Sequence, residues 1–180
     1  MKIVNMNTLN RVQQTQAAQI LVDELSMGWS TLAEALHEIN ERWKDEKDAV
    51  FLAAIENDEV IGWCGILPHY DGNVFELHPL AVRHDWQRKG VGSSLVKEIE
   101  NIARSKGGLV IWVGADDDKP GGETSFANAD LFDDFPKRIK EFNPGSHQSA
   151  FYMKQGYKII GVMPDADGPG KPDIFLAKRL

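Results

Sequence analysis

The chain contains 180 residues, with 27 acidic against 20 basic side chains and a formal net charge of -7. This length suits a single domain spanning residues 1–180, and a composition of 42% hydrophobic and 26% charged residues is typical of a globular protein. The negative charge argues against a general nucleic-acid binder, because phosphate contacts need clustered Lys and Arg side chains.

A single cysteine, Cys64, excludes an intrachain disulfide and any metal site built from several cysteines. It stands in an apolar stretch, which favours a buried structural thiol over a nucleophile. The N-terminus lacks the apolar run of a signal peptide, and no segment approaches the roughly 18 apolar residues of a membrane span. We therefore expect a cytoplasmic protein without membrane contact.

Hydrophobic periodicity and turn residues divide the chain into alternating elements. Strands are predicted over 3–6, 49–55, 60–67, 74–82, 109–113, 157–162 and 174–177. Helices are predicted over 10–27, 31–43, 93–105 and 148–155, and Thr31 with Glu34 forms a capping box at the start of the second. This order predicts a mixed α/β fold whose front half is largely antiparallel.

The remaining stretch, 114–146, is long and acidic, with a short helix expected within 127–142. From Asp116 to Asp134 it contains the acids Asp116, Asp117, Asp118, Glu123, Asp130, Asp133 and Asp134 and the single base Lys119. The stretch is either a solvated loop or one wall of a site for a cationic ligand. Its opening resembles a calcium loop, but Ala127 stands where the twelfth position needs a Glu, so no metal site is predicted.

The segment between the predicted strand 74–82 and the helix 93–105 reads Gln87-Arg88-Lys89-Gly90-Val91-Gly92-Ser93-Ser94. Glycines let the backbone approach an anion, and the first amides of the next helix point toward it. Arg88 and Lys89 add positive charge in an acidic chain. A plain helix-entry loop is the alternative. The dinucleotide fingerprint and the NTPase phosphate loop are both absent, which leaves Gln-x-x-Gly-x-Gly preceded by Leu80-Ala81-Val82.

These strings, together with 150–157, resemble the GNAT superfamily of N-acetyltransferases. Within that superfamily, the strings at 75–80, 114–117, 156–164 and 171–174 are similar to those of the aminoglycoside 6'-N-acetyltransferases. The resemblance is good over about residues 50–180 and covers the first 50 in outline. It implies the GNAT fold, a mixed and mostly antiparallel sheet flanked by helices, in which strand 74–82 bulges and splays from its neighbour.

The resemblance also implies acetyl-CoA as co-substrate, no metal, and a homodimer. The amides of 87–92 would hold the coenzyme pyrophosphate, the Leu80 amide would stabilise the thioester oxygen, and Tyr152 would protonate the departing thiolate. The implied coenzyme-binding residues are Leu80, Ala81, Val82, Gln87, Arg88, Lys89, Gly90, Val91, Gly92, Ser93, Ser94 and Tyr152.

Glu76 matches the carboxylate that the subgroup places near the acceptor amine, where it would act as a base or orient the substrate. Alternation along a strand places Glu76, His78, Leu80 and Val82 on one face. The implied substrate-binding residues are Trp29, Glu76, His78, Asp116, Asp117 and Asp173. Four of these have structural alternatives. Glu76 could be a plain surface charge, and His78 could simply pack or hydrogen-bond. Trp29 could belong to the core, and Asp173 could cap the turn before the last strand.

The leading hypothesis is an acetyl-CoA-dependent transfer to the 6'-amine of an aminoglycoside, by direct attack in a ternary complex. A second hypothesis keeps the enzyme class and changes the acceptor to a polyamine, a small metabolite amine or a protein amine. A third is a non-catalytic acyl-CoA-binding module, against which the presence of both Glu76 and Tyr152 argues.

Overall fold

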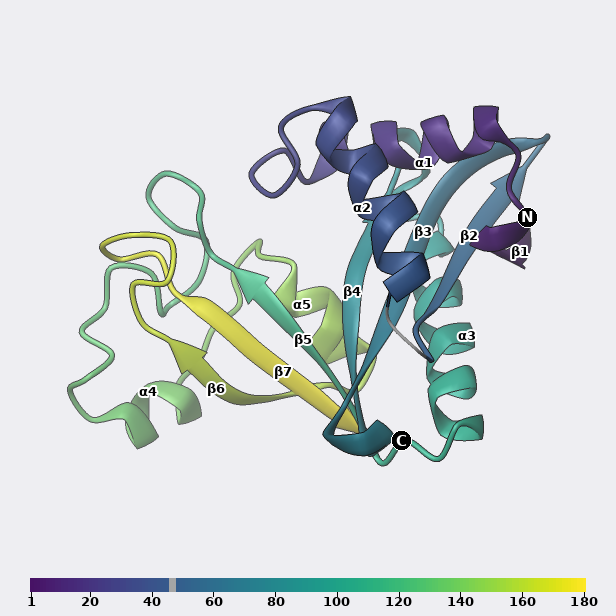
Figure 1. Ribbon diagram of the computed structural model, residues 1–180. Coiled ribbons are helices and arrows are strands. Elements are labelled where there is room, and N and C mark those ends of the chain that lie inside the picture. Colours follow the sequence, from purple (N-terminus) through teal and green to yellow (C-terminus); the bar gives the residue numbers. More distant parts are fainter. Residues whose placement is uncertain (46–47) are drawn as a thin grey trace. The chain divides into compact units, whose positions relative to one another are not determined.

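A computed structural model describes residues 1–45 and 48–180, and Figure 1 shows their helices and strands. The chain divides into two compact units, residues 1–109 with Leu180 and residues 110–179. The expected mixed α/β class is confirmed, while the single domain and the splay between strands of different units stay predictions. Among the described residues, no helix has both the length and the apolar character needed to span a membrane.

The first unit contains an antiparallel sheet in the order β1-β2-β3-β4. Its strands are β1 (Lys2–Asn5), β2 (Val50–Glu56), β3 (Glu59–His69) and β4 (Val74–Val82). Its helices are α1 (Arg11–Glu24), α2 (Leu32–Asp45) and α3 (Val91–Ser105). The predicted β2–β3 hairpin and the antiparallel front half are confirmed.

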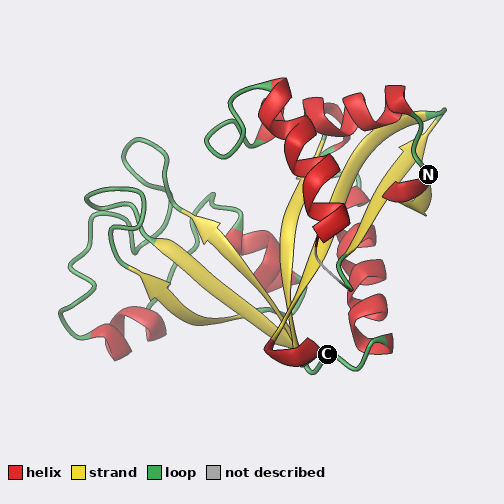
Figure 2. Cartoon of the chain, in the orientation of Figure 1, coloured by secondary structure: helices red, strands yellow, loops and turns green. Residues whose placement is uncertain are grey.

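The second unit contains a smaller sheet in which β7 (Asp173–Arg179) pairs antiparallel with both β5 (Val110–Asp116) and β6 (Lys158–Met163). Two short helices, α4 (Phe135–Lys140) and α5 (Ser149–Lys154), accompany it. Figure 2 shows how much of this unit is loop. The helix expected within 127–142 is confined to α4, because left-handed backbone at Asn128 and Asp134 interrupts a regular helix before Pro136 can start one.

Local capping explains where the first two helices begin. At α1, the Asn10 side chain accepts the Gln13 N–H at 3.0 Å, and the Gln13 side chain accepts the Asn10 N–H at 3.2 Å. At α2, the Thr31 hydroxyl accepts the Glu34 N–H at 3.2 Å, and the Glu34 carboxylate accepts the Thr31 N–H at 3.0 Å. The predicted Thr31–Glu34 capping box is confirmed, whereas the box at α1 was not predicted.

The core of the first unit lies between the sheet and helices α1 and α2. Trp63 is fully buried there and donates its indole N–H to the Ala17 carbonyl at 2.9 Å. Apolar residues of α1, α2, β2 and β3 surround it, including Leu21, Ile39 and Phe51. Burial of these side chains anchors both helices to one face of the sheet.

The pairing of β3 with β4 contains the bulge that the resemblance implied. Cys64 pairs with Leu80 and Ile66 pairs with Leu77, so β4 advances by three residues where β3 advances by two. Gly65 lies opposite the bulge, where a Cβ atom would come within 2.6 Å of the His78 carbonyl oxygen. The bulge therefore requires a residue without a side chain at position 65.

The bulge reverses the side of the sheet that later β4 side chains face. Glu76 pairs with Leu67 and Ala81 pairs with Trp63, and both partners belong to the core beneath α1 and α2. Directly paired residues of antiparallel strands share a face, so Glu76 and Ala81 share one despite the odd number of positions between them. The prediction that every second residue from Glu76 to Val82 faces one side is therefore wrong beyond the bulge.

We predict that Gly65→Ala destabilises the protein by about 1–3 kcal/mol, because the added Cβ atom would lie 2.3 Å from the Phe51 ring. Urea denaturation followed by circular dichroism measures the change. Gly161→Ala is the matched control in a strand, since its Cβ atom would meet the Phe175 ring at an ordinary 3.6 Å. Equal stability of the two variants would contradict the role given to Gly65.

Candidate functional site

The loop between β4 and α3 has the backbone of an anion-binding turn. Arg88 and Gly90 have φ angles of 57° and 87°, and Gly90 precedes the first residue of α3, Val91. A left-handed residue at this point turns the chain so that the helix starts directly after the loop. Residues 87–90 are exposed, including the Arg88 side chain, and they lead into the first turn of α3, whose N–H groups have no acceptor within the helix.

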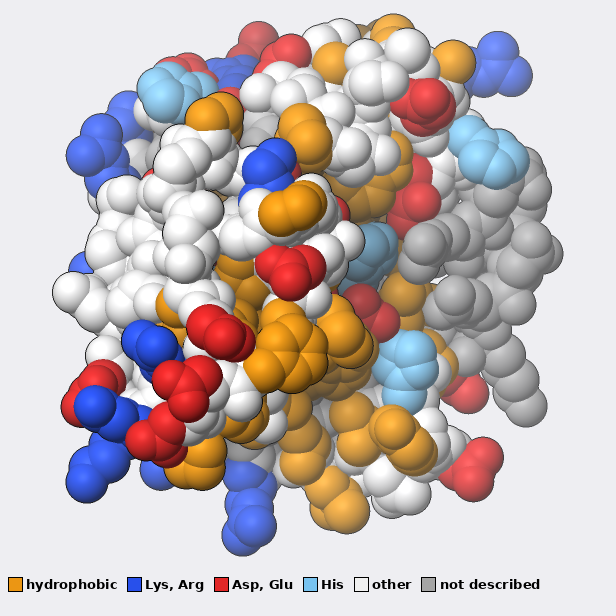
Figure 3. Space-filling model, turned by 90° about the vertical axis from the view of Figure 1, so that its left-hand side faces the viewer, with side chains coloured by type: hydrophobic (Ala, Val, Ile, Leu, Met, Phe, Trp, Pro, Cys, Tyr) orange, Lys and Arg blue, Asp and Glu red, His pale blue; other side chains and the backbone are white. Residues whose placement is uncertain are grey.

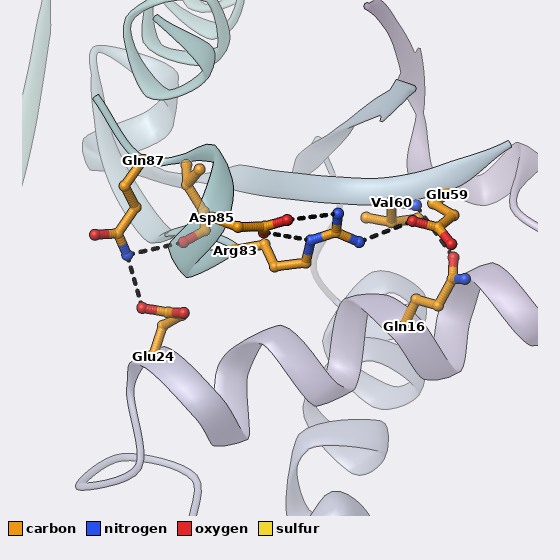
Figure 4. Close-up of polar contacts among 8 residues, drawn as sticks. Gln16, Glu24, Glu59, Val60, Arg83, Asp85 and Gln87 are labelled. Carbon is orange, nitrogen blue, oxygen red and sulfur yellow. Dashed lines mark hydrogen bonds and ion pairs between the residues drawn. The ribbon is translucent and has the colours of Figure 1, made fainter. Parts of the chain in front are cut away.

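The Gln87 side chain fastens this loop to two other elements, as Figure 4 shows. Its Nε2 donates to the Glu24 carboxylate at 2.6 Å and to the Val82 carbonyl oxygen at 3.0 Å. Glu24 is the last residue of α1 and Val82 is the last of β4. Gln87, predicted to bind a coenzyme, therefore uses its amide nitrogen to hold the loop in place, and its backbone N–H is also engaged, by the His84 carbonyl oxygen at 3.2 Å.

Positive charge near the loop is partly neutralised within the protein. Arg83 donates to both oxygens of Asp85, at 2.7 and 3.0 Å, and to Glu59 at 2.9 Å (Figure 4). The hydrogen bonds from Arg83 lower the pKa of Asp85. Lys89 lies 5.3 Å from the centre of the Trp86 ring, a cation–π distance. The Arg83 guanidinium is thus already paired with carboxylates. Arg88 and Lys89, the two basic residues of the Gln87–Gly92 motif, are the ones suited to an external anion.

A second group of polar side chains gathers on the face of β4 that carries Glu76. Glu76 Oε2 lies 3.0 Å from His69 Nε2, and Glu76 Oε1 lies 3.8 Å from His78 Nδ1. His78 Nε2 lies 3.6 Å from Glu38 Oε1, and the His78 ring is 5.9 Å from the Trp29 ring. The structure therefore brings together three predicted residues, Trp29, Glu76 and His78. Trp29 is partly buried and also packs against the core of the first unit, its predicted alternative.

His69 and Glu38 belong to this group, and sequence reasoning missed both. His69 is the last residue of β3, and Glu38 lies on α2 beside the buried Ile39. The only signal that could have indicated His69 is the register of the β3–β4 hairpin. In that register Glu76 pairs with Leu67, and His69 lies two residues further along β3. Nothing local in the sequence marks Glu38, because its contact depends on how α2 packs on the sheet.

In the second unit, Asp116 and Asp173 face each other at the ends of paired strands. The two residues are direct partners in the β5–β7 ladder, and their carboxyl groups hydrogen-bond to each other. Partial desolvation and the negative charges of Asp173, Asp167 and Asp118 raise the pKa of Asp116 to about 7. Asp173 also has a raised pKa, chiefly through desolvation. The pair therefore shares a proton near neutral pH.

Asp173 combines this contact with a structural one. Its Oδ1 accepts the Ala115 N–H at 2.9 Å, and Gly114 leaves the space, since a Cβ atom there would meet the carboxylate at 3.2 Å. Through this hydrogen bond Asp173 does not cap the turn before β7, because the donor, the Ala115 N–H, belongs to β5. Asp173 is partly buried, so part of its carboxyl group remains exposed to a ligand.

Asp117, in contrast, is 1% exposed and serves the loop that follows it. Its two carboxylate oxygens accept the N–H groups of Glu123 and Thr124, each at 2.8 Å. Its own N–H donates to the Pro172 carbonyl at 2.9 Å. These contacts give Asp117 a structural role in the loop, and its binding of a substrate stays a prediction.

Asp130, Asp133 and Asp134 of the predicted acidic stretch are exposed at the surface, as is Asp165, which lies outside that stretch. Figure 3 looks onto the side that carries α4 and β6, where acidic side chains lie among exposed hydrophobic ones. Asp130 and Asp165 line a shallow hollow together with Phe132, whose side chain is 83% exposed. Each of these acids has one oxygen engaged locally, by the N–H of Phe132 at 3.0 Å and of Gly170 at 2.7 Å.

Tyr152 lies on α5 and is 4% exposed. Its ring packs against Phe151 and Tyr157, at centroid distances of 5.2 and 5.7 Å. His147, which the sequence did not single out, joins the start of this helix to β5, with Nε2 2.9 Å from the Asp116 carbonyl oxygen. Its Nδ1 lies 3.0 Å from the Ser149 hydroxyl. His147 therefore fixes the segment that carries Tyr152.

Cys64 is fully buried, and desolvation raises the pKa of its thiol, so the predicted structural role is confirmed over a nucleophilic one.

Within residues 1–45 and 48–180, no group of three or more His, Cys, Asp or Glu side chains is arranged to hold a metal ion.

Comparison with known proteins identifies relatives along the whole chain. Residues 15–121 match the acetyltransferase (GNAT) family, and no curated protein matches significantly. Three solved structures are similar over 99% of this chain and 97% of their own. They are an aminoglycoside 6'-N-acetyltransferase complexed with coenzyme A (33% identity, TM-score 0.89), one from Enterococcus faecium (31%, 0.86) and an aminoglycoside 6'-acetyltransferase type Ii (30%, 0.75).

We predict that the protein loses stability as the pH rises through about 7, and that Asp116→Asn reduces this loss. The folded chain holds a proton on Asp116 that the unfolded chain, with a pKa of about 3.9, has already released, so the contribution of this carboxyl group to stability is full below about pH 4 and is lost as the pH rises through about 7. Melting temperatures at about pH 5 and about pH 8 measure the effect, which we expect to be on the order of 2 °C.

Asp133→Asn is the control for this experiment, since Asp133 is an exposed acid of the same unit. An identical pH dependence in Asp116→Asn, Asp133→Asn and the unaltered protein would show that the Asp116–Asp173 pair does not share a proton.

Proposed function

Because the chain belongs to the acetyltransferase (GNAT) family, we propose that it transfers the acetyl group of acetyl-CoA to the 6'-amine of an aminoglycoside. The observation that carries this proposal is the similarity, at 30–33% identity over 99% of the chain, to three aminoglycoside 6'-acetyltransferases. One of them was solved with coenzyme A, which supports the same coenzyme here. The homodimer and the cytoplasmic location remain predictions.

On the donor side, we assign the coenzyme pyrophosphate to the loop of residues 87–94. The left-handed Gly90 and the first turn of α3 present N–H groups that suit phosphate oxygens, and Arg88 and Lys89 add opposite charge. Val91 is buried and anchors the helix start, so only the backbone at that position would contact the coenzyme. Leu80, Ala81 and Val82 would accompany the pantetheine arm beside the bulge.

On the acceptor side, we assign Glu76 to the reacting amine. An ammonium group has no lone pair, so it must lose a proton before its nitrogen attacks the thioester carbon. The carbon–sulfur bond then breaks, the amide forms, and the thiolate takes up a proton for which Tyr152 is the proposed donor. The Leu80 amide is the proposed partner of the thioester oxygen, where negative charge develops during attack.

The polycationic character of an aminoglycoside suits acidic groups, and each unit by itself contains such a group. Glu76 and Glu38 lie near Trp29 in the first unit, and Asp116 with Asp173 forms an acidic pair in the second. Each ammonium group of the sugar rings needs a charge-assisted hydrogen bond, for which carboxylates are the natural acceptors. Polyamines and other amines share this charge, so the acceptor has to be tested directly.

We predict that the protein releases coenzyme A from acetyl-CoA with kanamycin, and that an aminoglycoside carrying a 6'-hydroxyl in place of the 6'-amine is inactive. A thiol reagent measures the release, and a panel containing spermidine and a peptide amine gives comparative kcat/KM values. A higher kcat/KM for an amine outside the aminoglycosides would overturn the acceptor assignment while leaving the enzyme class intact.

We also predict that Gln87→Ala weakens coenzyme A binding about three- to tenfold, because the loop loses its two anchoring hydrogen bonds. Isothermal titration calorimetry gives the dissociation constant. Gln19→Ala is the control, since Gln19 is an exposed amide of α1 whose side chain bonds to Asp23. If Gln87→Ala binds coenzyme A as tightly as Gln19→Ala does, the two hydrogen bonds of the Gln87 side chain do not shape the coenzyme loop.

A further inference from the structure

We propose that His69 is a positioning residue for acetyl transfer, which holds one oxygen of the Glu76 carboxylate so that the other is directed toward the acceptor amine. This inference rests on the assignment of Glu76 to the reacting amine. His69 is the last residue of β3 and lies outside the proposed coenzyme loop of residues 87–94 in the sequence. Its contact with Glu76 Oε2, at 3.0 Å, is the shortest polar contact of the group around Glu76.

The contact follows from the architecture of the β3–β4 hairpin. Glu76 pairs with Leu67, and His69 pairs with Val74, so His69 and Glu76 are diagonal neighbours across an antiparallel ladder. Such neighbours share a face and lie within reach of long side chains. The register that fixes β4 in the sheet therefore also fixes the distance between the imidazole and the carboxylate. No flexible loop contributes to this pair, because the turn begins only at Tyr70.

The two oxygens of Glu76 have different surroundings. Oε2 is engaged by His69, whereas Oε1 faces His78 Nδ1 at 3.8 Å, a separation too long for a hydrogen bond. The Glu76 side chain is 22% exposed and the His69 side chain is 42% exposed. Oε2 is therefore occupied by a neighbour held on the hairpin, while the long contact of Oε1 leaves that oxygen as the one to accept from an amine.

The groups that face this pair belong to three elements. His69 comes from β3, Glu76 and His78 come from β4, and Glu38 comes from α2, where it lies 3.6 Å from His78 Nε2. Two carboxylates thus alternate with two imidazoles around the reacting group. A Glu side chain without a fixed partner samples several rotamers, and only some of them place an oxygen at the amine. His69 removes that freedom.

The test compares His69→Phe, which keeps a ring and loses the donor, with His69→Gln, which keeps an N–H donor of similar reach. Steady-state kinetics uses acetyl-CoA and whichever amine of the panel is acetylated, so that failure of the aminoglycoside assignment leaves this test intact. We expect about a tenfold lower kcat in His69→Phe with an unchanged KM for acetyl-CoA, and recovery to within about threefold in His69→Gln.

A double-mutant cycle separates positioning from general damage to the fold. In a Glu76→Gln background we expect His69→Phe to cause no further loss beyond about twofold, because the oriented carboxylate is already gone. His37→Phe is the control, since His37 is an exposed histidine of α2 outside the group. A full tenfold loss in the Glu76→Gln background, or the same loss in His37→Phe, would overturn the proposal.

A measurement without turnover tests the contact itself. Long-range 1H–15N spectra of the free protein should show His69 protonated on Nε2, the nitrogen that faces Glu76, and this resonance should shift in Glu76→Ala. An Nε2 signal that is unprotonated and unmoved by Glu76→Ala would overturn the proposal, even if the enzyme acetylates no amine of the panel.

Discussion

The bulge in β4 is the constraint on which the arrangement of the first unit depends. It inserts one residue opposite Gly65. Because side chains alternate between the two faces of a strand, every β4 side chain beyond the inserted residue lies on the opposite face from the one it would otherwise have. Glu76 consequently points to the side of α1 and α2, where Trp29 and Glu38 lie, while Leu80 points to the other side. A regular strand would have placed the carboxylate and Leu80 together.

The same strand leads directly into the anion-binding loop, so the two proposed halves of the reaction share one structural element. The loop is held by Gln87, which ties it to the end of β4 and to the last residue of α1. Arg83 is paired with Asp85 and Glu59, so the charge beside the loop is taken up within the protein and Arg88 and Lys89 supply the cations of the loop itself. A chain with a net charge of -7 can therefore present a locally cationic surface to a phosphate.

The acidic groups of the second unit show that net charge alone does not define a binding site. Asp117 and Asp116 are adjacent in sequence, yet Asp117 is buried among loop amides and Asp116 shares a proton with Asp173 across the β5–β7 ladder. A carboxylate whose oxygens accept buried N–H groups stabilises a loop, whereas a crowded, partly exposed pair gains from the approach of a cation.

The sequence by itself determined the element order, the cap of α2, the burial of Cys64 and the position of the coenzyme motif. These follow from short-range causes, namely hydrophobic periodicity, glycine at a left-handed position and side chains that cap the next turn. Only the tertiary structure decided that Glu76 and Leu80 face opposite sides, that Asp117 is structural, and that His69 and Glu38 join the group around Glu76. Strand register, a bulge and helix packing set those contacts, and none of them is encoded in residues that are neighbours in the chain.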